Sequence, residues 1–396
     1  VYAENATVSG GGTISVGESG TGIYVKNSDL NISALTLNMN KNNSVGIYLD
    51  SGSNMNTTGT NTINVTGTKN TLFYVNTDGT FNQNFVINGS SNAGYTLMYL
   101  NNNKALYNGS AVISGDSTIF YGMNSLIELG SSASLTAAGG NATGIYSDGL
   151  YGGTATYEGI NNGEMQFGDN SAGMYGVNGA RLLNTGNITV GNESLGISAK
   201  GSSYLRNTGT IQTGSDSVGM SAENVALTEN TGSISAAGEN ITGLLSKNTG
   251  TSVITNNGTI ELAGKNTIGV YLETGGQQTF TNNQLIKTEN SDNLSIASAG
   301  IYNNGHVVNN AGNIVSGIGS AGIYNNMGII NETGSISSEA GGVSIYSSGG
   351  EINLISGTIN NNGIGIYAEN NTSIVNTGIK VNAGTNTAAY VLKSGS

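Results

Sequence analysis

The sequence predicts an all-β protein, a right-handed parallel β-helix (a solenoid) of about 16 rungs with roughly 24 residues and three strands in each rung. Three observations predict this fold: a short repeated motif, the strand-like content of each repeat and the absence of proline. The motif is Gly-Ile-Tyr or Gly-Val-Tyr, and it stands at 22–24, 46–48, 144–146, 269–271, 300–302, 322–324 and 365–367. Weaker copies fill the intervals, and a period of this length indicates a solenoid.

Each repeat contains three short β-like runs. Within 322–346 these runs are 323–324, 329–330 and 335–337, and Asn, Gly, Ser and Thr separate them. Such punctuated apolar runs are typical of strands joined by turns. No stretch keeps the apolar spacing of three and four residues that an amphipathic helix needs.

Composition supports stacked strands. The 396 residues include no proline and 63 glycines. Proline would remove a ladder hydrogen bond wherever a strand has a neighbour on both sides, whereas Gly and Asn supply positive-φ corners. Asn-Thr-Gly recurs at 184–186, 207–209, 230–232 and 376–378. We expect these tripeptides to be such corners, with their asparagines stacked in hydrogen-bonded ladders.

The facing of the strands follows from the alternation of side chains. We expect Val45, Ile47 and Leu49 to point into the core, and Gly46 and Tyr48 to point outward. Tyrosines of successive rungs would then form a column on one outer face. The column either stabilises that face through ring–ring contacts or is an exposed aromatic stripe that docks a partner.

The chain reads as a single β-helix segment over residues 1–396. The repeat is in register at Tyr2 and still at Tyr390, and neither end shows the atypical repeat that usually caps a solenoid. This predicts an internal slice of a longer chain. Two rungs are longer than the others, which predicts projecting loops at 147–167 and 287–295.

Charge and residue types limit the possible chemistry. The net charge is −12, and Lys and Arg form no patch, which argues against a nucleic-acid partner. The chain has no cysteine and one histidine, His306, which we expect to be a polar residue at a strand start. We therefore expect no metal site and no cofactor.

Carboxylate pairs are the remaining enzymatic feature. Glycoside hydrolases need two carboxylates that face each other across the substrate, but the acids of this chain do not recur in register. The best candidates are Asp148, Glu158 and Glu164, which belong to the longer rung. A polysaccharide-active hydrolase or lyase is the alternative function, although we expect no catalytic residue and no enzyme.

The repeats at 207–211, 217–220 and 321–325 read Asn-Thr-Gly-Thr-Ile, Ser-Val-Gly-Met and Ala-Gly-Ile-Tyr-Asn. They resemble passenger domains of the very large type V autotransporter adhesins of fusobacteria, and the resemblance covers essentially the whole chain. It implies a bacterial cell-surface adhesin that attaches to other bacteria, host glycans or host cell receptors. It also implies an extracellular location, anchored to the outer membrane only through a C-terminal barrel that is not in this chain. The resemblance places no site residue of the family on this sequence.

Tyrosines that leave the register indicate a binding region. Four of the five lie between residues 95 and 157, close to the longer rung, and binding groups tend to lie on loops held by a rigid scaffold. The predicted ligand-binding residues are Tyr95, Tyr107, Asp148, Tyr151, Tyr157, Glu158 and Phe167. Their rings would stack on sugar faces while the carboxylates accept hydrogen bonds from hydroxyl groups. The alternative is that these rings pack over the solenoid as loop anchors.

Overall fold

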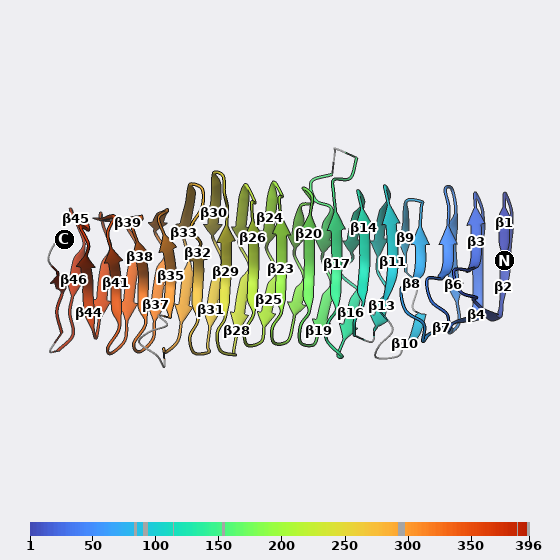
Figure 1. Cartoon of the computed structure of the whole chain (residues 1–396), viewed down its shortest axis with the longest axis horizontal. Coiled ribbons are helices and arrows are strands. Elements are labelled where there is room, and N and C mark those ends of the chain that lie inside the picture. The colour runs from blue at the N-terminus through green and yellow to red at the C-terminus, as the bar shows by residue number, and fades with distance from the viewer. Residues whose placement is uncertain are drawn as a thin grey trace. The chain divides into compact units, whose positions relative to one another are not determined.

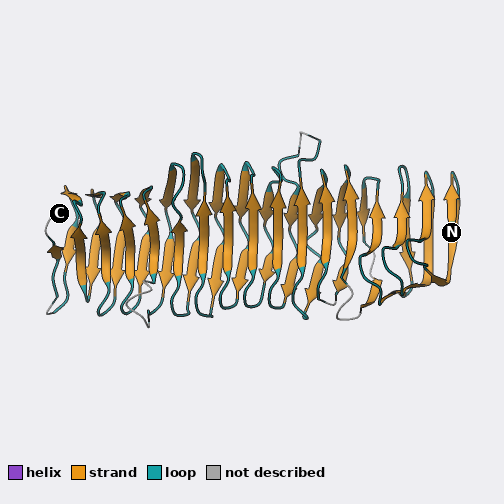
Figure 2. Cartoon of the chain, viewed as in Figure 1, coloured by secondary structure: helices purple, strands orange, loops and turns teal. Residues whose placement is uncertain are grey.

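The computed structural model describes residues 1–82, 85–89, 94–113, 115–152, 155–291, 298–385 and 387–393. These residues form strands and turns, with no helix among them (Figure 2), and hence none that is long and apolar enough to cross a membrane. The chain is a parallel β-solenoid of about 16 turns with ~24 residues per turn and three to four parallel sheets, which confirms the predicted fold class. It divides into two compact units, residues 1–191 with 196–201 (unit 1) and residues 192–195 with 202–396 (unit 2).

A regular rung of unit 1 contributes one strand to each of three sheets, called here the tyrosine sheet, the second sheet and the third sheet (Figure 1). The tyrosine sheet contains β1 (Tyr2–Glu4), β3 (Thr21–Lys26), β5 (Val45–Leu49), β8 (Asn70–Val75), β11 (Tyr95–Asn101), β14 (Thr118–Met123), β17 (Thr143–Asp148), β20 (Ala172–Val177) and β23 (Leu195–Lys200). The second sheet contains β9 (Gly79–Phe81), β12 (Lys104–Tyr107), β15 (Leu126–Leu129), β18 (Gly159–Asn161) and β21 (Leu182–Asn184). The third sheet contains β13 (Ser110–Val112), β16 (Ser134–Ala137), β19 (Glu164–Phe167) and β22 (Asn187–Thr189).

The first rungs of unit 1 differ because two long strands replace the second and third strands. A further sheet contains β2 (Thr7–Ser15), β4 (Asp29–Met39), β6 (Asn54–Thr58), β7 (Asn61–Val65) and β10 (Phe85–Gly89). The first part of β4 pairs with β6 and its last part with β7. Between the two parts, Ala34 bends the strand with a φ of 54°.

Unit 2 repeats the same three-strand rung. Its tyrosine sheet contains β26 (Val218–Glu223), β29 (Thr242–Lys247), β32 (Ile268–Leu272), β35 (Ala299–Asn304), β38 (Ala321–Asn326), β41 (Val343–Ser348), β44 (Ile364–Glu369) and β47 (Tyr390–Leu392). Its second sheet contains β24 (Tyr204–Asn207), β27 (Leu227–Asn230), β30 (Ser252–Asn256), β33 (Gln278–Asn282), β36 (Val307–Asn310), β39 (Ile329–Glu332), β42 (Glu351–Leu354) and β45 (Ser373–Asn376). Its third sheet contains β25 (Thr210–Thr213), β28 (Ser233–Ala236), β31 (Thr259–Leu262), β34 (Leu285–Thr288), β37 (Asn313–Ser316), β40 (Ser335–Ser338), β43 (Thr358–Asn361) and β46 (Lys380–Asn382).

The core is a column of aliphatic side chains, with one from each strand of a rung. Ile323, Ile330 and Ile336 come from the three sheets of one rung, and none of them is exposed to solvent. Each stacks on its counterpart in the next rung because the strands pair in parallel register. Full burial of each such side chain stabilises the fold by roughly 1.5–3 kcal/mol.

The glycine of the repeated motif points inward, which corrects the predicted facing. Ile47 and Leu49 are in the core as predicted, but Val45 is only half-buried and Gly46 is buried. The reason is clear at Gly300, where a Cβ would lie 2.5 Å from Ile314 Cγ2 and 2.7 Å from the carbonyl oxygen of Gly322. The inward–outward alternation of side chains therefore fails at this glycine, because the backbone of the tyrosine sheet packs here directly against side chains of the third sheet.

A buried asparagine stands at the corner between the second and third sheets. In unit 2 each amide of this corner donates to the asparagine of the next rung at 2.8–2.9 Å, along Asn207, Asn230, Asn256, Asn282 and Asn310. In unit 1 Asn161 donates to Asn184 at 2.8 Å. These bonds confirm the predicted ladders.

The predicted backbone conformation of these corners is wrong. None of the Asn-Thr-Gly residues has a positive φ. Glycine is needed at these corners for another reason. A Cβ at Gly186 would lie 2.1 Å from the Gly163 carbonyl oxygen, and a Cβ at Gly232 would lie 2.0 Å from the Gly209 carbonyl oxygen. The positive-φ asparagines stand instead at the two ends of the tyrosine strands, as Asn141 and Asn224 do.

Candidate binding site

A ten-residue connection interrupts the regular rungs of unit 1 between β17 and β18. Gly149, with a φ of 82°, begins this connection, and Glu158 ends it. The same connection takes only residues 224–226 between β26 and β27. Figure 1 shows the longer connection projecting beyond the neighbouring turns. The sequence placed the loop at 147–167, a range that also includes the end of β17 and all of β18 and β19. Residues 153–154 lie outside the described residues, as do residues 292–297, which include part of the second predicted loop at 287–295.

A buried ion pair clamps the base of the loop. Glu158 has no exposed surface, and Arg181 Nη2 lies 2.6 Å from its Oε1, while Arg181 Nε donates to its Oε2 at 3.1 Å. The backbone N–H of Arg181 donates to the same Oε2 at 2.8 Å. Arg181 Nη2 also donates to the Ala155 carbonyl at 2.5 Å. The hydrogen bonds to Glu158 raise the pKa of the Arg181 guanidinium, which therefore stays charged.

Tyr151 extends from the loop toward earlier rungs. Its backbone N–H lies 3.4 Å from Glu158 Oε1, and its phenol donates to Asp78 Oδ2 at 3.5 Å. Asp78 also accepts the backbone N–H of Lys104 at 2.7 Å. Partial burial, together with Asp78, raises the pKa of the Tyr151 phenol. Beside Tyr151, Leu150 leaves 48% of its surface in solvent, so the loop presents one aliphatic and one aromatic side chain.

Asp148 lies at the end of β17 and belongs to the tyrosine sheet. It accepts the Tyr121 phenol at 3.3 Å and the Asn178 amide at 2.7 Å. Burial and the Asp148 charge raise the pKa of Tyr121 to about 12. Asp148 is half-buried. Its oxygens are already engaged by hydrogen bonds from Tyr121 and Asn178 of neighbouring rungs.

Four of the seven predicted ligand-binding residues have their rings in or against the core. Tyr95, Tyr107 and Phe167 lie on β11, β12 and β19, not on loops, and each is buried. Tyr157 is in the loop but is also buried. Tyr107 packs on Phe120 with ring centroids 5.1 Å apart, and burial raises the pKa of its phenol. Tyr95, Tyr107 and Phe167 are therefore core residues of their strands, and only the buried Tyr157 fits the alternative of a loop anchor.

The three carboxylates considered for an enzyme belong to different parts of the rung. Asp148 ends a strand of the tyrosine sheet, Glu158 is buried before the second sheet, and the exposed Glu164 begins a strand of the third sheet. Among the described residues, no group of three His, Asp or Glu side chains could hold a metal ion. His306, which the sequence placed at a strand start, is buried just before β36, and its Nε2 lies 2.7 Å from the Glu273 carbonyl oxygen.

The tyrosine column stacks its rings on one another. In unit 1 the centroids lie 4.4–5.6 Å apart along Tyr2, Tyr24, Tyr48, Tyr74, Tyr99, Tyr121, Tyr146 and Tyr175. In unit 2 they lie 4.6–5.2 Å apart along Tyr271, Tyr302, Tyr324, Tyr346 and Tyr367. A sugar stacks on the face of an aromatic ring, but inside these stacks both faces are covered by other rings. The column is therefore a stabilising ladder whose ring edges and hydroxyl groups face outward.

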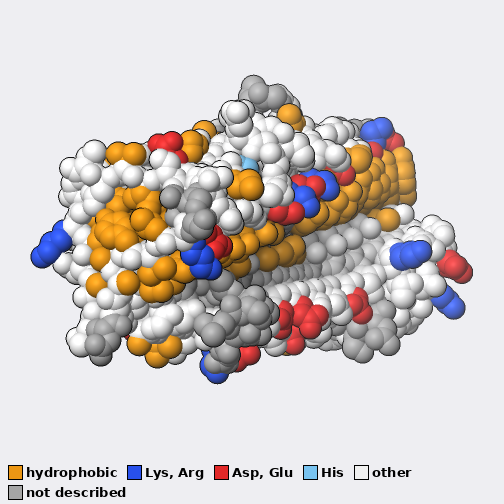
Figure 3. Space-filling model, turned by 60° about the vertical axis from the view of Figure 1, so that its left-hand side comes forward, with side chains coloured by type: hydrophobic (Ala, Val, Ile, Leu, Met, Phe, Trp, Pro, Cys, Tyr) orange, Lys and Arg blue, Asp and Glu red, His pale blue; other side chains and the backbone are white. Residues whose placement is uncertain are grey.

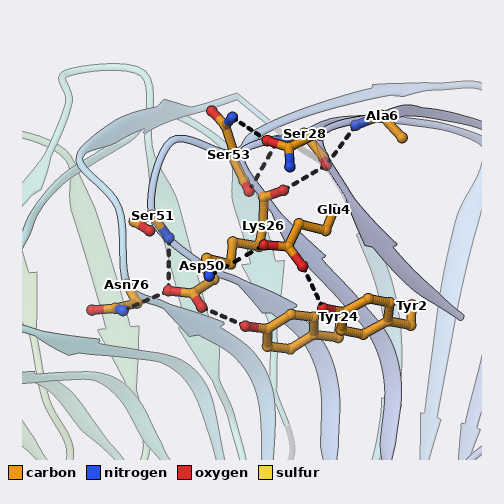
Figure 4. Close-up of polar contacts among 12 residues, drawn as sticks. Tyr2, Glu4, Ala6, Tyr24, Lys26, Ser28, Asp50, Ser51, Ser53 and Asn76 are labelled. Carbon is orange, nitrogen blue, oxygen red and sulfur yellow. Dashed lines mark hydrogen bonds and ion pairs between the residues drawn. The ribbon is translucent and has the colours of Figure 1, made fainter.

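A row of polar side chains runs beside the rings (Figure 4). Asp50 accepts hydrogen bonds from the Tyr24 phenol, the Ser51 backbone and the Asn76 amide. Although partial burial opposes it, these bonds lower the pKa of Asp50. The hydrogen bond to Asp50, with some burial, raises the pKa of Tyr24 to about 12. Charged groups on the face in Figure 3 are scattered or paired and form no large area of one sign.

Sequence reasoning missed the residues that organise the loop. Arg181 and Asp78 contact it from rungs that follow and precede it. The chain has only two arginines, Arg181 and Arg206, and each pairs with a glutamate of a neighbouring rung. Their rarity in a chain otherwise poor in charge was the available signal.

The fold and the loop define a class of protein: a long parallel β-solenoid that carries a clamped surface loop on a regular scaffold. The chain belongs to the family of the BigA third pectate lyase-like domain, whose model matches residues 4–224, more than half of the sequence and all of the loop. No curated protein and no solved structure matches the chain.

Proposed function

We propose that this chain is an adhesive segment of a bacterial cell-surface protein, the passenger of a large autotransporter of the fusobacterial type. In this proposal it is displayed outside the cell and anchored to the outer membrane. Its partners are the surface of other bacteria, a host glycan or a host cell receptor. The proposal includes no catalysis and no nucleic-acid partner.

The observation that carries the proposal is the clamped loop. A buried ion pair costs desolvation that a well-packed apolar pair would avoid, so the Glu158–Arg181 pair is a poor device for stability alone. It holds the projecting segment at several points, since Arg181 contacts Glu158 and the Ala155 carbonyl together, and the Tyr151 N–H lies 3.4 Å from Glu158 Oε1. A loop held rigid before contact binds with a smaller entropy cost. The side chains that it offers to a partner are Leu150 and Tyr151.

Truncation of the two outward side chains tests the proposal. Beads coated with the full chain or with Leu150→Ser/Tyr151→Ala are applied to a glycan array, cultured epithelial cells and partner bacteria. We expect the variant to lose most attachment to whichever target the parent chain binds, with little change in melting temperature. The matched control is Leu183→Ser/Tyr175→Ala, which removes the same types of side chain from half-buried outward positions on β21 and β20. Equal attachment by the folded loop variant and the parent chain would contradict this assignment.

A further inference from the structure

The second sheet of unit 2 carries a straight row of four aliphatic side chains and one threonine on its outer face. Parallel register places them one per rung. The row, called here the aliphatic row, is Leu227, Val253, Thr279, Val307 and Ile329. Leu227, Val253 and Ile329 leave 37%, 46% and 38% of their surface in solvent, and the other two are half-buried. At about 4.8 Å per rung, the row is roughly 19 Å long.

The aliphatic row has the same chemistry when read in either direction. Thr279 is at its centre, a valine stands on each side, and a γ-branched or β-branched aliphatic residue stands at each end. A surface that is unchanged by reversal can contact an identical surface around a two-fold axis, because each residue then meets its counterpart from the other end. In such a contact, Thr279 would meet Thr279, Val253 would meet Val307, and Leu227 would meet Ile329.

The residues just beyond the two ends of the row would also face each other in this arrangement. Tyr204 pairs in register with Leu227 at one end, and Glu351 pairs with Ile329 at the other. On the outer face of the Tyr204 rung, Arg206 lies 3.1 Å from Glu229. Reversal places Tyr204 of one copy opposite Glu351 of the other, while the Arg206–Glu229 ion pair already balances its own charge within each copy.

We propose that the aliphatic row is a self-association surface that holds two copies of this chain antiparallel, with the two-fold axis at Thr279. An identical solenoid has the same rung spacing, so contacts stay in register along the whole row, as they do between paired sheets with matched side chains. Five small side chains bury much less than a standard interface of about 800 Å² per partner. The contact is therefore weak for one pair and strengthens when many copies are displayed together.

An antiparallel pair is also the arrangement of two chains that extend toward each other from opposite surfaces. The contact would then join cells that carry the same protein, and this last step rests on the proposed cell-surface function. Self-association of the chain in solution does not depend on that function, because the row is in unit 2 and the loop is in unit 1. Loss of attachment by the loop variant and loss of self-association are thus separate results.

Sedimentation equilibrium of the full chain over a wide concentration range is the first test. We expect a reversible monomer–dimer equilibrium, which Val307→Glu weakens at least about tenfold because it places an unpaired carboxylate against Val253 of the other copy at two symmetric positions. The matched control is Val315→Glu, a half-buried outward valine on the adjacent strand β37 of the third sheet. A monomer at every concentration, or equal weakening by the control variant, would overturn the proposal.

Cysteine cross-linking tests the direction of the pair, and the natural chain contains no cysteine that could interfere. Under mild oxidation, Thr279→Cys is expected to form a disulfide-linked dimer. Leu227→Cys alone is expected to stay unlinked, whereas a mixture of Leu227→Cys and Ile329→Cys forms a mixed dimer. Efficient linkage of Leu227→Cys to itself would indicate parallel copies and would overturn the antiparallel arrangement. Linkage of Val315→Cys as efficient as that of Thr279→Cys would show random collision and would overturn it too.

Discussion

The two units build the same rung but treat the second sheet differently. In unit 1 a clamped loop projects beside this sheet, and its Tyr151 reaches back to Asp78. In unit 2 the corresponding connections take only two to five residues, and the sheet presents the aliphatic row. The core needs neither arrangement, since the inward side chains of the strands fill both units. The difference teaches that contact surfaces are made where a unit departs from the repeat, while the repeat itself makes the scaffold.

The largest expected effect comes from the inward glycine. In unit 2, Gly300→Leu would force a side chain between Ile314 and the Gly322 carbonyl, at a cost above about 4 kcal/mol. In unit 1, Leu97 occupies the glycine position of its rung, and Ala111 occupies the isoleucine position. We therefore expect Gly300→Leu/Ile314→Ala to recover part of the loss. Chemical denaturation measures both variants, and no recovery by the double variant would show that backbone contact alone requires the glycine.

Removal of the arginine from an ion pair should cost several kcal/mol more stability in unit 1 than in unit 2. In unit 1, Arg181→Met leaves the fully buried Glu158 without its cation and should cost about 3–5 kcal/mol. In unit 2, Arg206→Met breaks a pair with both side chains partly exposed and should cost about 0–1 kcal/mol. Thermal unfolding, with hydrogen exchange followed in each unit, measures both costs. Glu158→Gln/Arg181→Met should recover much of the first loss, and equal costs for the two single variants would contradict the buried clamp.

The asparagine ladder of unit 2 ends at a buried carboxyl and makes that unit sensitive to pH. Glu332 has no exposed surface, and both its oxygens accept the Asn310 amide at 2.8 and 2.9 Å. Burial raises the pKa of Glu332 from 4.5 to about 8, against the hydrogen bonds from Asn310 and Gly334. Between these pH values the folded state keeps a proton that the unfolded state has lost. Its contribution to stability is therefore full below pH 4.5 and is lost as pH rises through about 8.

Glu332→Gln should remove this dependence. We expect the variant to be more stable than the parent chain by a few kcal/mol at pH 9, and by little at pH 5. Stability is measured by urea unfolding at each pH, with Glu339→Gln as an exposed control in the same unit. A parent chain that gains stability relative to Glu332→Gln as pH rises would reverse the sign and contradict the account.

The tyrosine stacks give the smallest expected difference between the two units. Tyr74 lies 4.4 and 4.9 Å from its two neighbours in unit 1, and Tyr324 lies 4.6 and 4.8 Å from its own in unit 2. Each Tyr→Ala change should cost about 1–3 kcal/mol from two ring contacts. Leu245→Tyr should stabilise unit 2, because Leu245 stands beside Tyr271 at the end of the stack. Unequal losses at Tyr74 and Tyr324 would show that the stack has a different role in the two units.

The fold could be predicted because its cause is periodic. Each rung places inward aliphatic residues, often Ile or Val, at the same positions of its strands. That repetition is visible in the sequence. The facing of Gly46 could not be read from alternation, since it depends on the Met39 side chain of β4 and the Leu72 carbonyl of the next rung. Corner glycines such as Gly232 were expected to have a positive φ. They are required instead by a close carbonyl oxygen of the neighbouring rung, and such a contact leaves no local signal in the sequence.

The site was predicted only in part. The length of the rung located the loop, and Tyr151 is indeed on it. Tyr95 and Tyr107 are out of register with the motif because they are buried at the start of β11 and the end of β12. A count of tyrosine spacing does not reveal this. Arg181 and Asp78 contact the loop from other rungs, and only the three-dimensional stacking brings them there.

Replacement of the loop tests the central claim most directly. Residues 149–157 are exchanged for Asn-Val-Ala, the connection at 224–226 in unit 2, with Glu158 and Arg181 kept in place. Attachment to the target of the parent chain is then measured together with melting temperature and sedimentation. The account predicts that attachment is lost while the fold and the self-association remain. Retained attachment by the folded loop-exchange chain would contradict it.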